Sequence, residues 1–259
     1  MCTVVVSLDP DAAWPVVLLG LRDEQPGRPW DPPGAWWPEL GEHVQGLRDR
    51  EAGGAWLATS SAPPRLAVVL NRREQPEPPE GGFTTRGALP LEAVVEGAPP
   101  RGPHTSRTYN LVTADAHGVL HASWDGRGAA AAPLAPGVHV VTHGAVDDDR
   151  VPRVARWAPR FRAAPRPSGP PPAPGEGEGS WRGWLDVLRE SALLPVTDEA
   201  AIVRADAVGG AVLRSLSVSL VALSPTEVAH AHVRLDPDRS VADALADRSL
   251  GRSLGRARP

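Results

Sequence analysis

Proline and glycine set the first limit on what this chain can fold into, since 30 prolines and 26 glycines are distributed over 259 residues. Proline removes a backbone N–H and glycine costs conformational entropy, so both interrupt helices and strands and favour turns. Much of the chain must therefore be turns and loops. The apolar segments between them are short and rich in β-branched residues, which is typical of strands.

Nine apolar segments are predicted to be strands, and one further segment has apolar residues at helical spacing. The first two strands form a hairpin across Asp9-Pro10-Asp11, which is a turn signal. Strands in hairpin order with few helices predict an α+β fold with largely antiparallel sheets. The predicted strands are Thr3–Leu8, Trp14–Leu21, Ala55–Ala58, Leu66–Leu70, Tyr109–Ala114, Val119–Trp124, Val138–Thr142, Val212–Leu223 and Val228–Leu235, and the predicted helix is Trp181–Leu194.

Three segments are expected to lie outside this framework. Between Gln25 and Pro38, proline is frequent enough to exclude a helix or a central strand. Residues 163–180 contain three consecutive prolines and then Gly-Glu-Gly-Glu-Gly, so they cannot bury enough apolar surface to order themselves. We expect a flexible surface insertion there. The last residues, 241–259, are basic and are expected to form a frayed tail.

Composition excludes several classes of function. All 27 basic residues are arginine, which rules out a lysine Schiff base and a Walker lysine. With 31 acidic residues against them, nucleic acid is not an expected partner. A single cysteine excludes internal disulfides and cysteine-built metal sites. No apolar run reaches the roughly 18 residues of a membrane span, and no secretory signal is recognisable, so a cytoplasmic location is expected.

Cys2 is the strongest candidate for chemistry because of its position. An initiator methionine is normally removed before a small residue, and the mature chain would then begin with a cysteine. Its α-amino group has an ordinary pKa of about 7.7–8.0, close to that of an ideal general base at neutral pH. One residue would thus supply both a nucleophile and its base, as in N-terminal-nucleophile hydrolases. The alternative is a small apolar residue at a chain end.

The charged group Arg22-Asp23-Glu24 closes the second predicted strand. If the first two strands pair, this group returns close to Cys2. The Arg22 guanidinium would then favour a thiolate, and a carboxylate could hold the α-ammonium group. A solvated charged turn is the alternative.

Other candidates are weaker. His230 and His232 share one strand face, but no third metal ligand is identifiable, so no metal site is predicted. Asp147-Asp148-Asp149 is better explained as a solvated turn. The glycine-rich segment at 175–179 follows no strand, so a phosphate-binding loop is rejected there.

An ordered set of short motifs resembles the NRDE family, the transport-and-Golgi-organisation proteins. The similarity extends over about residues 1 to 235. Its motifs are Met1-Cys2 before a β-run, Leu21-Arg22-Asp23-Glu24, Arg28-Pro29, Gly46-Leu47-Arg48-Asp49 continuing through Gly53-Gly54-Ala55-Trp56-Leu57, Leu70-Asn71, Thr85-Arg86-Gly87, Tyr109-Asn110-Leu111 and Arg214-Ser215-Leu216-Ser217.

The resemblance implies an N-terminal-nucleophile fold of four layers, αββα, with two stacked antiparallel sheets in a single domain over residues 1–240. It also implies roles for matching residues. Cys2 would attack an amide carbonyl, Arg22 and Asp23 would tune the thiol and the α-amino group, and Asn71 would contribute an oxyanion donor. Arg214 would be a late-chain arginine near the site. Trp56, Asn110 and His143 are candidate ligand contacts.

Several residues depart from the family pattern. Leu21 stands where members carry asparagine, Ala55 where they carry threonine, and Thr142-His143 where they carry Ser-Asn. Polar groups are thus lost around the expected pocket, which leaves the identity of the substrate open.

Three functions follow as alternatives. The first is a hydrolase of a non-peptide amide or thioester, working through a Cys2 acyl-enzyme and requiring no cofactor. The second is a non-catalytic carrier or trafficking protein of the same fold for haem or an acyl-CoA-like lipid, with Cys2, His143 or tryptophans as contacts. The third is an interaction domain that uses the exposed Pro/Trp loop at residues 26–38.

Overall fold

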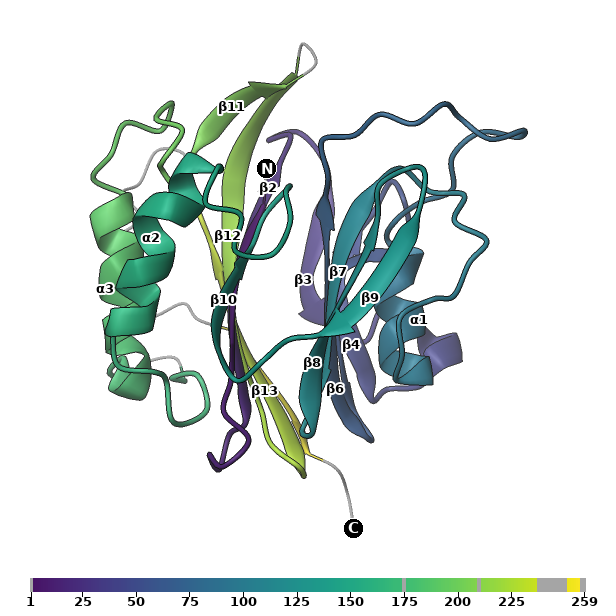
Figure 1. Ribbon diagram of the computed structural model, residues 1–259. Helices are drawn as coiled ribbons and strands as arrows, with labels where there is room; N and C mark the ends of the chain where they lie inside the picture. The colour runs from purple at the N-terminus through teal and green to yellow at the C-terminus, as the bar shows by residue number, and fades with distance from the viewer. Residues whose placement is uncertain (1, 174–175, 209–210, 237–250, 257–259) are drawn as a thin grey trace.

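The computed structural model describes residues 2–173, 176–208, 211–236 and 251–256. Two antiparallel sheets face each other in the middle of the molecule, and helices cover their outer faces (Figure 1). Helices α2 (Pro152–Ala163) and α3 (Arg182–Ser191) cover one sheet, and α1 (Ala88–Glu96) covers the other. The predicted α+β sandwich of four layers, αββα, is therefore confirmed.

The first sheet is assembled from distant parts of the chain. Its strands lie in the order β10-β1-β2-β12-β13-β14, with β11 also paired to β12. A strand from the end of the chain, β12, is thereby inserted beside β2 from its beginning. The strands are β1 (Thr3–Leu8), β2 (Val16–Glu24), β10 (Gly137–Val141), β11 (Ala205–Val208), β12 (Ala211–Leu223), β13 (Glu227–Arg234) and β14 (Gly251–Arg256).

The second sheet is a meander in which consecutive strands are neighbours, from β3 to β9. Each pair is antiparallel, so short turns are sufficient for most of its connections. Its strands are β3 (Trp30–Gly34), β4 (Val44–Asp49), β5 (Ala55–Ser61), β6 (Pro64–Asn71), β7 (Tyr109–Asp115), β8 (Gly118–Trp124) and β9 (Ala129–Pro133).

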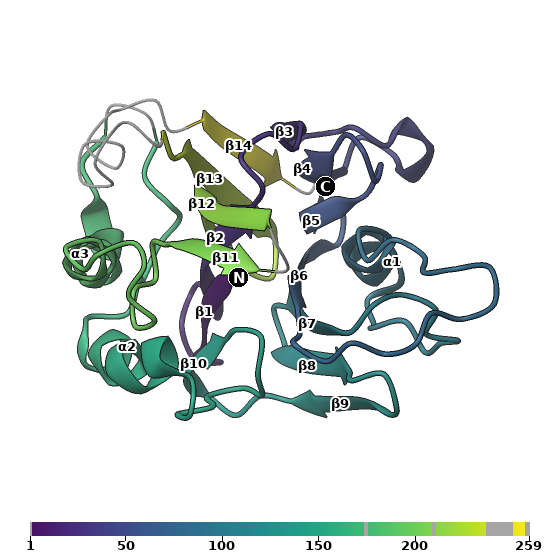
Figure 2. The same cartoon turned by 90° about the horizontal axis from the view of Figure 1, so that it is seen from above.

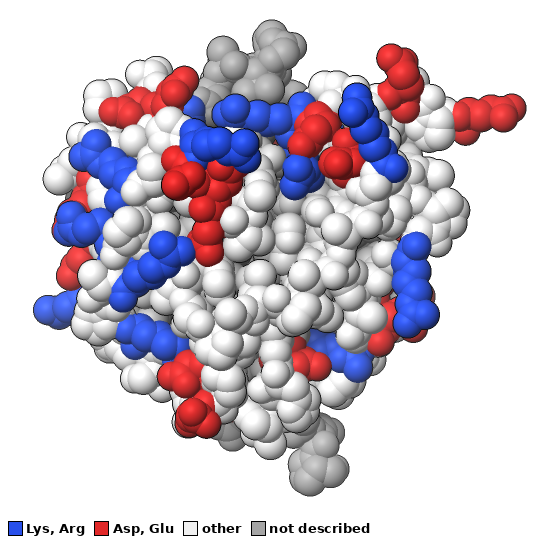
Figure 3. Space-filling view, viewed as in Figure 1, with Lys and Arg blue, Asp and Glu red and all other residues white. Residues whose placement is uncertain are grey.

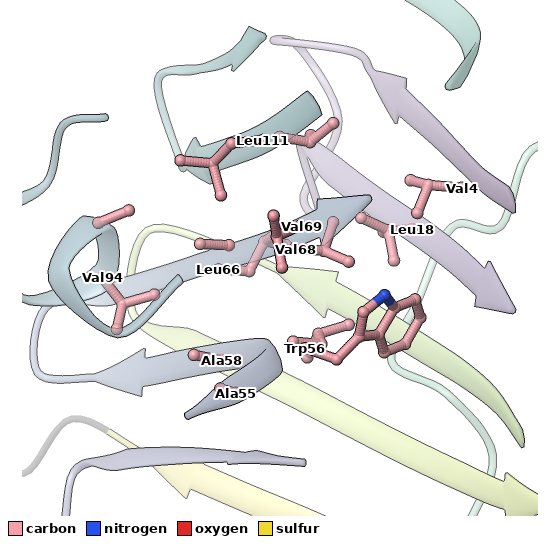
Figure 4. Packing of buried hydrophobic residues seen from close by; sticks show 14 of the residues in the cluster. Val4, Leu18, Ala55, Trp56, Ala58, Leu66, Val68, Val69, Val94 and Leu111 are labelled. Atoms are coloured by element: carbon pink, nitrogen blue, oxygen red, sulfur yellow. The ribbon is translucent and has the colours of Figure 1, made fainter. Parts of the chain in front are cut away.

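Both faces of the first sheet are buried, which explains its continuous apolar strands. In β1, Val4 and Val6 point between the sheets, whereas Val5 points to the helices, because side chains alternate along a strand. The layer between the sheets includes Trp56, which lies near Val4 and Leu18 in Figure 4. The helical layer is closed by edge-to-face contacts among Phe161, Trp181 and Trp184.

All nine predicted strands are present, with ends that differ by a few residues, and the predicted helix corresponds to α3 after a short 3-10 turn (Gly179–Trp181). The proline-rich loop contains a strand, β3, but this strand is an edge of its sheet and carries a bulge, where proline is tolerated. A 3-10 turn, Pro38–Leu40, follows it. Helices α1 and α2 and strands β4, β9, β11 and β14 were not predicted.

The predicted insertion at residues 163–180 and the predicted tail have different outcomes. Residues 163–173 and 176–178 contain no strand, and α2 ends at Ala163, but Arg166 donates to Ser7 Oγ and to the carbonyl oxygens of Trp14 and Pro15. The mobility of this segment stays a prediction. The frayed tail is corrected for residues 251–256, which pair with β13 through backbone hydrogen bonds. The remaining parts of the tail, 241–250 and 257–259, lie outside the described residues.

No helix in the described ranges combines the length and the apolar character that a bilayer span requires.

Candidate active site

A cleft of about 1040 Å³ opens at the end of the sandwich where the chain begins. Figure 2 shows the N-terminus in this position, between the two sheets. The walls come from the ends of β2 and β6, the start of β5 and the loop at residues 83–87. Both sheets thus contribute side chains to one cavity, with Cys2 among its lining residues.

The Cys2 sulfur is held by the backbone of the neighbouring strand. The Asp23 N–H donates to Sγ at 3.3 Å, and the thiol faces the Asp23 carbonyl oxygen at 3.6 Å. Only 8% of the residue is exposed. Burial, and next the negative charge of Asp23, raise the pKa of the thiol to about 11, against the opposing charges of the chain's amino terminus and Arg22. Sγ is therefore a protonated thiol at neutral pH in this chain.

Arg22 and Asp23 lie beside Cys2, as the hairpin prediction required. The pairing of β1 with β2 sets Thr3 opposite Leu21, so Arg22 comes next to Cys2. The Arg22 guanidinium is buried and lies 3.6 Å from carboxylate oxygens of Glu24 and Asp49. Its positive charge is thus shared within an acidic group at the cleft wall.

Ser215 contributes to the site although no role was predicted for it, and it stands in the last motif of the family resemblance. Its hydroxyl donates to Asp23 Oδ1 at 2.6 Å, across the pairing of β2 with β12. A bulge between Ser215 and Ser217 changes the register at this point. Only the insertion of β12 beside β2 brings these residues together, because 192 positions separate them. The hydrogen bond orients the carboxylate next to Cys2.

Asn71 and Trp56 also line the cleft, as predicted. Asn71 ends β6 and is exposed, and its side-chain amide makes no hydrogen bond within the described part of the chain. Trp56 is largely buried and packs against Gly20 of β2, where an added Cβ would lie 3.1 Å from the indole. The Trp56 indole therefore forms an apolar floor, while Asn71 offers a free amide.

Asn110 is placed differently from the prediction of a ligand contact. It is fully buried and lies outside the cleft lining. Its amide nitrogen donates to the carbonyl oxygens of Thr142 and Gly144, at 2.9 and 2.7 Å. Its oxygen accepts from Arg72 and from His121, both at 3.0 Å. All of its hydrogen-bonding capacity is used to join the second sheet to the end of β10.

His143 and Arg214 also lie outside the described lining of this cleft. His143 follows β10 and is 2% exposed, near the start of β1, because Val141 pairs with Val4. Burial, with nearby arginine charges, lowers its pKa to about 3, so the ring is neutral. Arg214 lines a separate hollow of about 420 Å³ together with Trp30 and Arg234.

Arg86 lines the cleft and was not among the candidates, although it stands in a motif of the family resemblance. The loop that carries it is fixed by two glycines in backbone contact. A Cβ on Gly54 would lie 2.4 Å from the Gly87 carbonyl carbon, and the Ala55 N–H donates to the Gly87 oxygen at 2.8 Å. These two glycines allow β5 and the start of α1 to approach closely, which places Arg86 in the wall.

Replacing Gly54 by alanine should push the loop at residues 83–87 away from β5. We expect a loss of about 1–3 kcal/mol in the free energy of unfolding, since backbone atoms cannot yield as a flexible side chain can. Urea unfolding of Gly54→Ala measures the loss. Gly118→Ala is the matched control, because a Cβ at Gly118 has no neighbour within 4 Å. Equal stability of the two variants would contradict the close packing.

The sequence was also compared with known protein families. The family model described as Transport and Golgi organisation 2 matches residues 1–169. The chain belongs to this family. No curated protein matches the sequence.

The family match covers Cys2, Arg22, Asp23, Trp56, Asn71 and Arg86, and it confirms the resemblance that the short motifs indicated. It ends before α3 and β12. The place of Ser215 beside Asp23 therefore rests on the three-dimensional structure.

Proposed function

We propose that this member of the Transport and Golgi organisation 2 family is a cysteine N-terminal-nucleophile hydrolase of a non-peptide amide or a thioester. The observation that carries the proposal is the position of Cys2. It immediately precedes β1, its sulfur contacts the backbone of Asp23, and it lines a cleft large enough for a small molecule.

The chemistry requires Cys2 to be the first residue of the mature chain. Its α-amino group then accepts the proton of Sγ, and the thiolate attacks the carbonyl carbon of the substrate. As the C–N or C–S bond breaks, the leaving group takes that proton from the α-ammonium group. Water, deprotonated by the same amine, hydrolyses the thioester that joins the acyl group to Sγ. Asp23, oriented by Ser215, supports the ammonium form.

Asn71 is the best side-chain donor for the oxyanion that forms in both steps. Its amide lines the same cleft as Cys2 and has no other described hydrogen bond to break. A donor that is already in place stabilises the developing charge without reorganisation. Backbone N–H groups of the cleft would supply the second contact.

Removal of Met1 should activate the thiol strongly. With Met1 attached, the thiol pKa is about 11, and only a small fraction is thiolate at neutral pH. We expect a thiol-reactive probe to label protein that begins at Cys2 rapidly at pH 7, and protein that retains Met1 slowly, at a rate that rises with pH. Intact mass before and after labelling distinguishes the two forms. Equally slow labelling of both forms would contradict an activated nucleophile.

The residues of the cleft do not favour the haem carrier. Haem iron is usually held by histidine, cysteine thiolate, methionine or tyrosine. Among the described residues that line the cleft, Cys2 alone belongs to these types, and it is mostly buried. His143, the other predicted haem contact, is buried and does not line the cleft.

A further inference from the structure

The cleft around Cys2 carries an excess of positive charge. Six arginines line it, Arg22, Arg28, Arg72, Arg73, Arg86 and Arg107, against three carboxylates, Asp23, Glu24 and Asp49. Figure 3 shows arginine and acidic side chains gathered at the same end of the sandwich. The net charge of the whole chain is −4, so this excess is local.

Three of these arginines are neutralised within the protein. Arg22 lies near Glu24 and Asp49, Arg28 bonds to Asp49, and Arg72 bonds to Glu74. The charges of these three arginines are paired with carboxylates of the protein and are not available to a ligand.

The other three, Arg73, Arg86 and Arg107, form no ion pair with any carboxylate among the described residues. Arg86 is partly buried, and its one described hydrogen bond goes to the Thr108 carbonyl oxygen at 3.1 Å. Burial, followed by repulsion from Arg107, lowers the pKa of Arg86. Arg107 lies over the Phe83 ring at 4.9 Å and reaches the neutral Gln75 side chain.

The surroundings of Arg86 are unfavourable for its charge, whereas Arg73 and Arg107 are exposed to water. Taking a guanidinium out of water costs free energy unless a charge or hydrogen-bond acceptors replace the water. Like charges that face one another add to that cost. A bound anion would remove both costs, and guanidinium groups match the geometry of carboxylate and phosphate oxygens.

We infer that Arg86, Arg107 and Arg73 bind a multiply charged oxyanion group of the ligand, either a phosphate ester or a polycarboxylate. Phe83 lies beside this group and would contact the adjoining apolar part. Calling this ligand the substrate rests on the proposed hydrolase function. The binding of an anion by these arginines does not depend on whether Cys2 reacts.

Direct binding of simple anions tests this site. Isothermal titration of the full chain with inorganic pyrophosphate and, separately, with succinate distinguishes the phosphate from the carboxylate source. Wild type should bind at least one of them at low ionic strength. Arg86→Gln should weaken binding about tenfold, as expected for the loss of a charge-assisted hydrogen bond. Arg73→Ala, at an exposed position, should weaken it severalfold without affecting the fold.

Arg101→Ala is the matched control, since Arg101 is exposed and lies outside the cleft lining. Absence of binding of both anions to wild type, or binding to Arg86→Gln and Arg73→Ala as tight as to the control, would overturn the inference. Cys2→Ala separates it from the proposed function. Anion binding by that variant, together with an inactive wild type, would retain the anion site and reject the hydrolase.

Discussion

Replacing Cys2 by alanine should abolish turnover while the fold remains. The sulfur is the only nucleophile that the proposed acyl-enzyme can use, and loss of a nucleophile that acts in concert with its base costs on the order of 10³-fold or more. Cys2 lies at the start of β1 and its side chain is small, so the packing loss is modest. The measurement is the rate of hydrolysis of the best substrate from a screen of amides and thioesters, with circular dichroism as the test of folding.

Cys2→Ser is the matched variant, because it keeps the size of the side chain and the α-amino group. We expect it to be folded and far slower than wild type, since a hydroxyl is a weaker nucleophile than a thiol near neutral pH. Native-rate turnover by Cys2→Ala would reject the hydrolase.

Mild acid should unfold the protein, because three buried histidines and the half-buried His121 cannot easily accept protons in the folded state. Burial is the first cause in each case and lowers the pKa values from 6.5 to about 4 for His121 and His230 and to about 3 for His143 and His232. Below pH 6.5 the unfolded chain takes up protons that the folded chain excludes, so stability falls as the pH falls.

The expected effect is large. Each of these histidines contributes a loss of about 1.4 kcal/mol per pH unit below its unfolded pKa, and four together approach the total stability of a typical domain within about two to three units. His139 acts in the opposite direction, because its hydrogen bond to Asp147 raises its pKa. Urea unfolding at several pH values between 7 and 4 should show stability declining steeply below about pH 6.

His230→Leu should reduce the pH dependence of the free energy of unfolding by the amount that corresponds to about one proton. Neither ring nitrogen of His230 has a hydrogen-bond partner among the described residues. His117→Leu, in an exposed turn, is the control. A slope in His230→Leu equal to that of wild type would show that this histidine does not oppose protonation.

Much of the fold was predictable because its strands are local patterns. In Thr3–Leu8 and the following strand, apolar residues are continuous and bounded by turn signals, so the first hairpin and the return of Arg22 and Asp23 to Cys2 followed directly. The missed elements lack such patterns. Strand β9 consists of exposed alanines and a proline, and it forms because it pairs with β8.

Helix α1 was missed for a related reason. It is short, contains Pro90, and has no side chain that caps its N-terminus. Its apolar face is stabilised by packing against β5 and β6, and Gly97 ends it in the left-handed conformation. None of these contacts is visible in a nine-residue segment taken alone.

The sequence by itself determined the family, the order of the main strands and the group formed by Cys2, Arg22 and Asp23, since these depend on short-range patterning and on one hairpin. Only the tertiary structure decided which polar residues face the cleft. Asn110 uses its side-chain hydrogen bonds to link the two sheets. Ser215 binds Asp23 from a distant strand, and Arg86 lines the cleft from a distant loop. The physical reason is that burial, protonation and ion pairing depend on neighbours in space, and the pairing of β2 with β12 joins residues almost 200 positions apart.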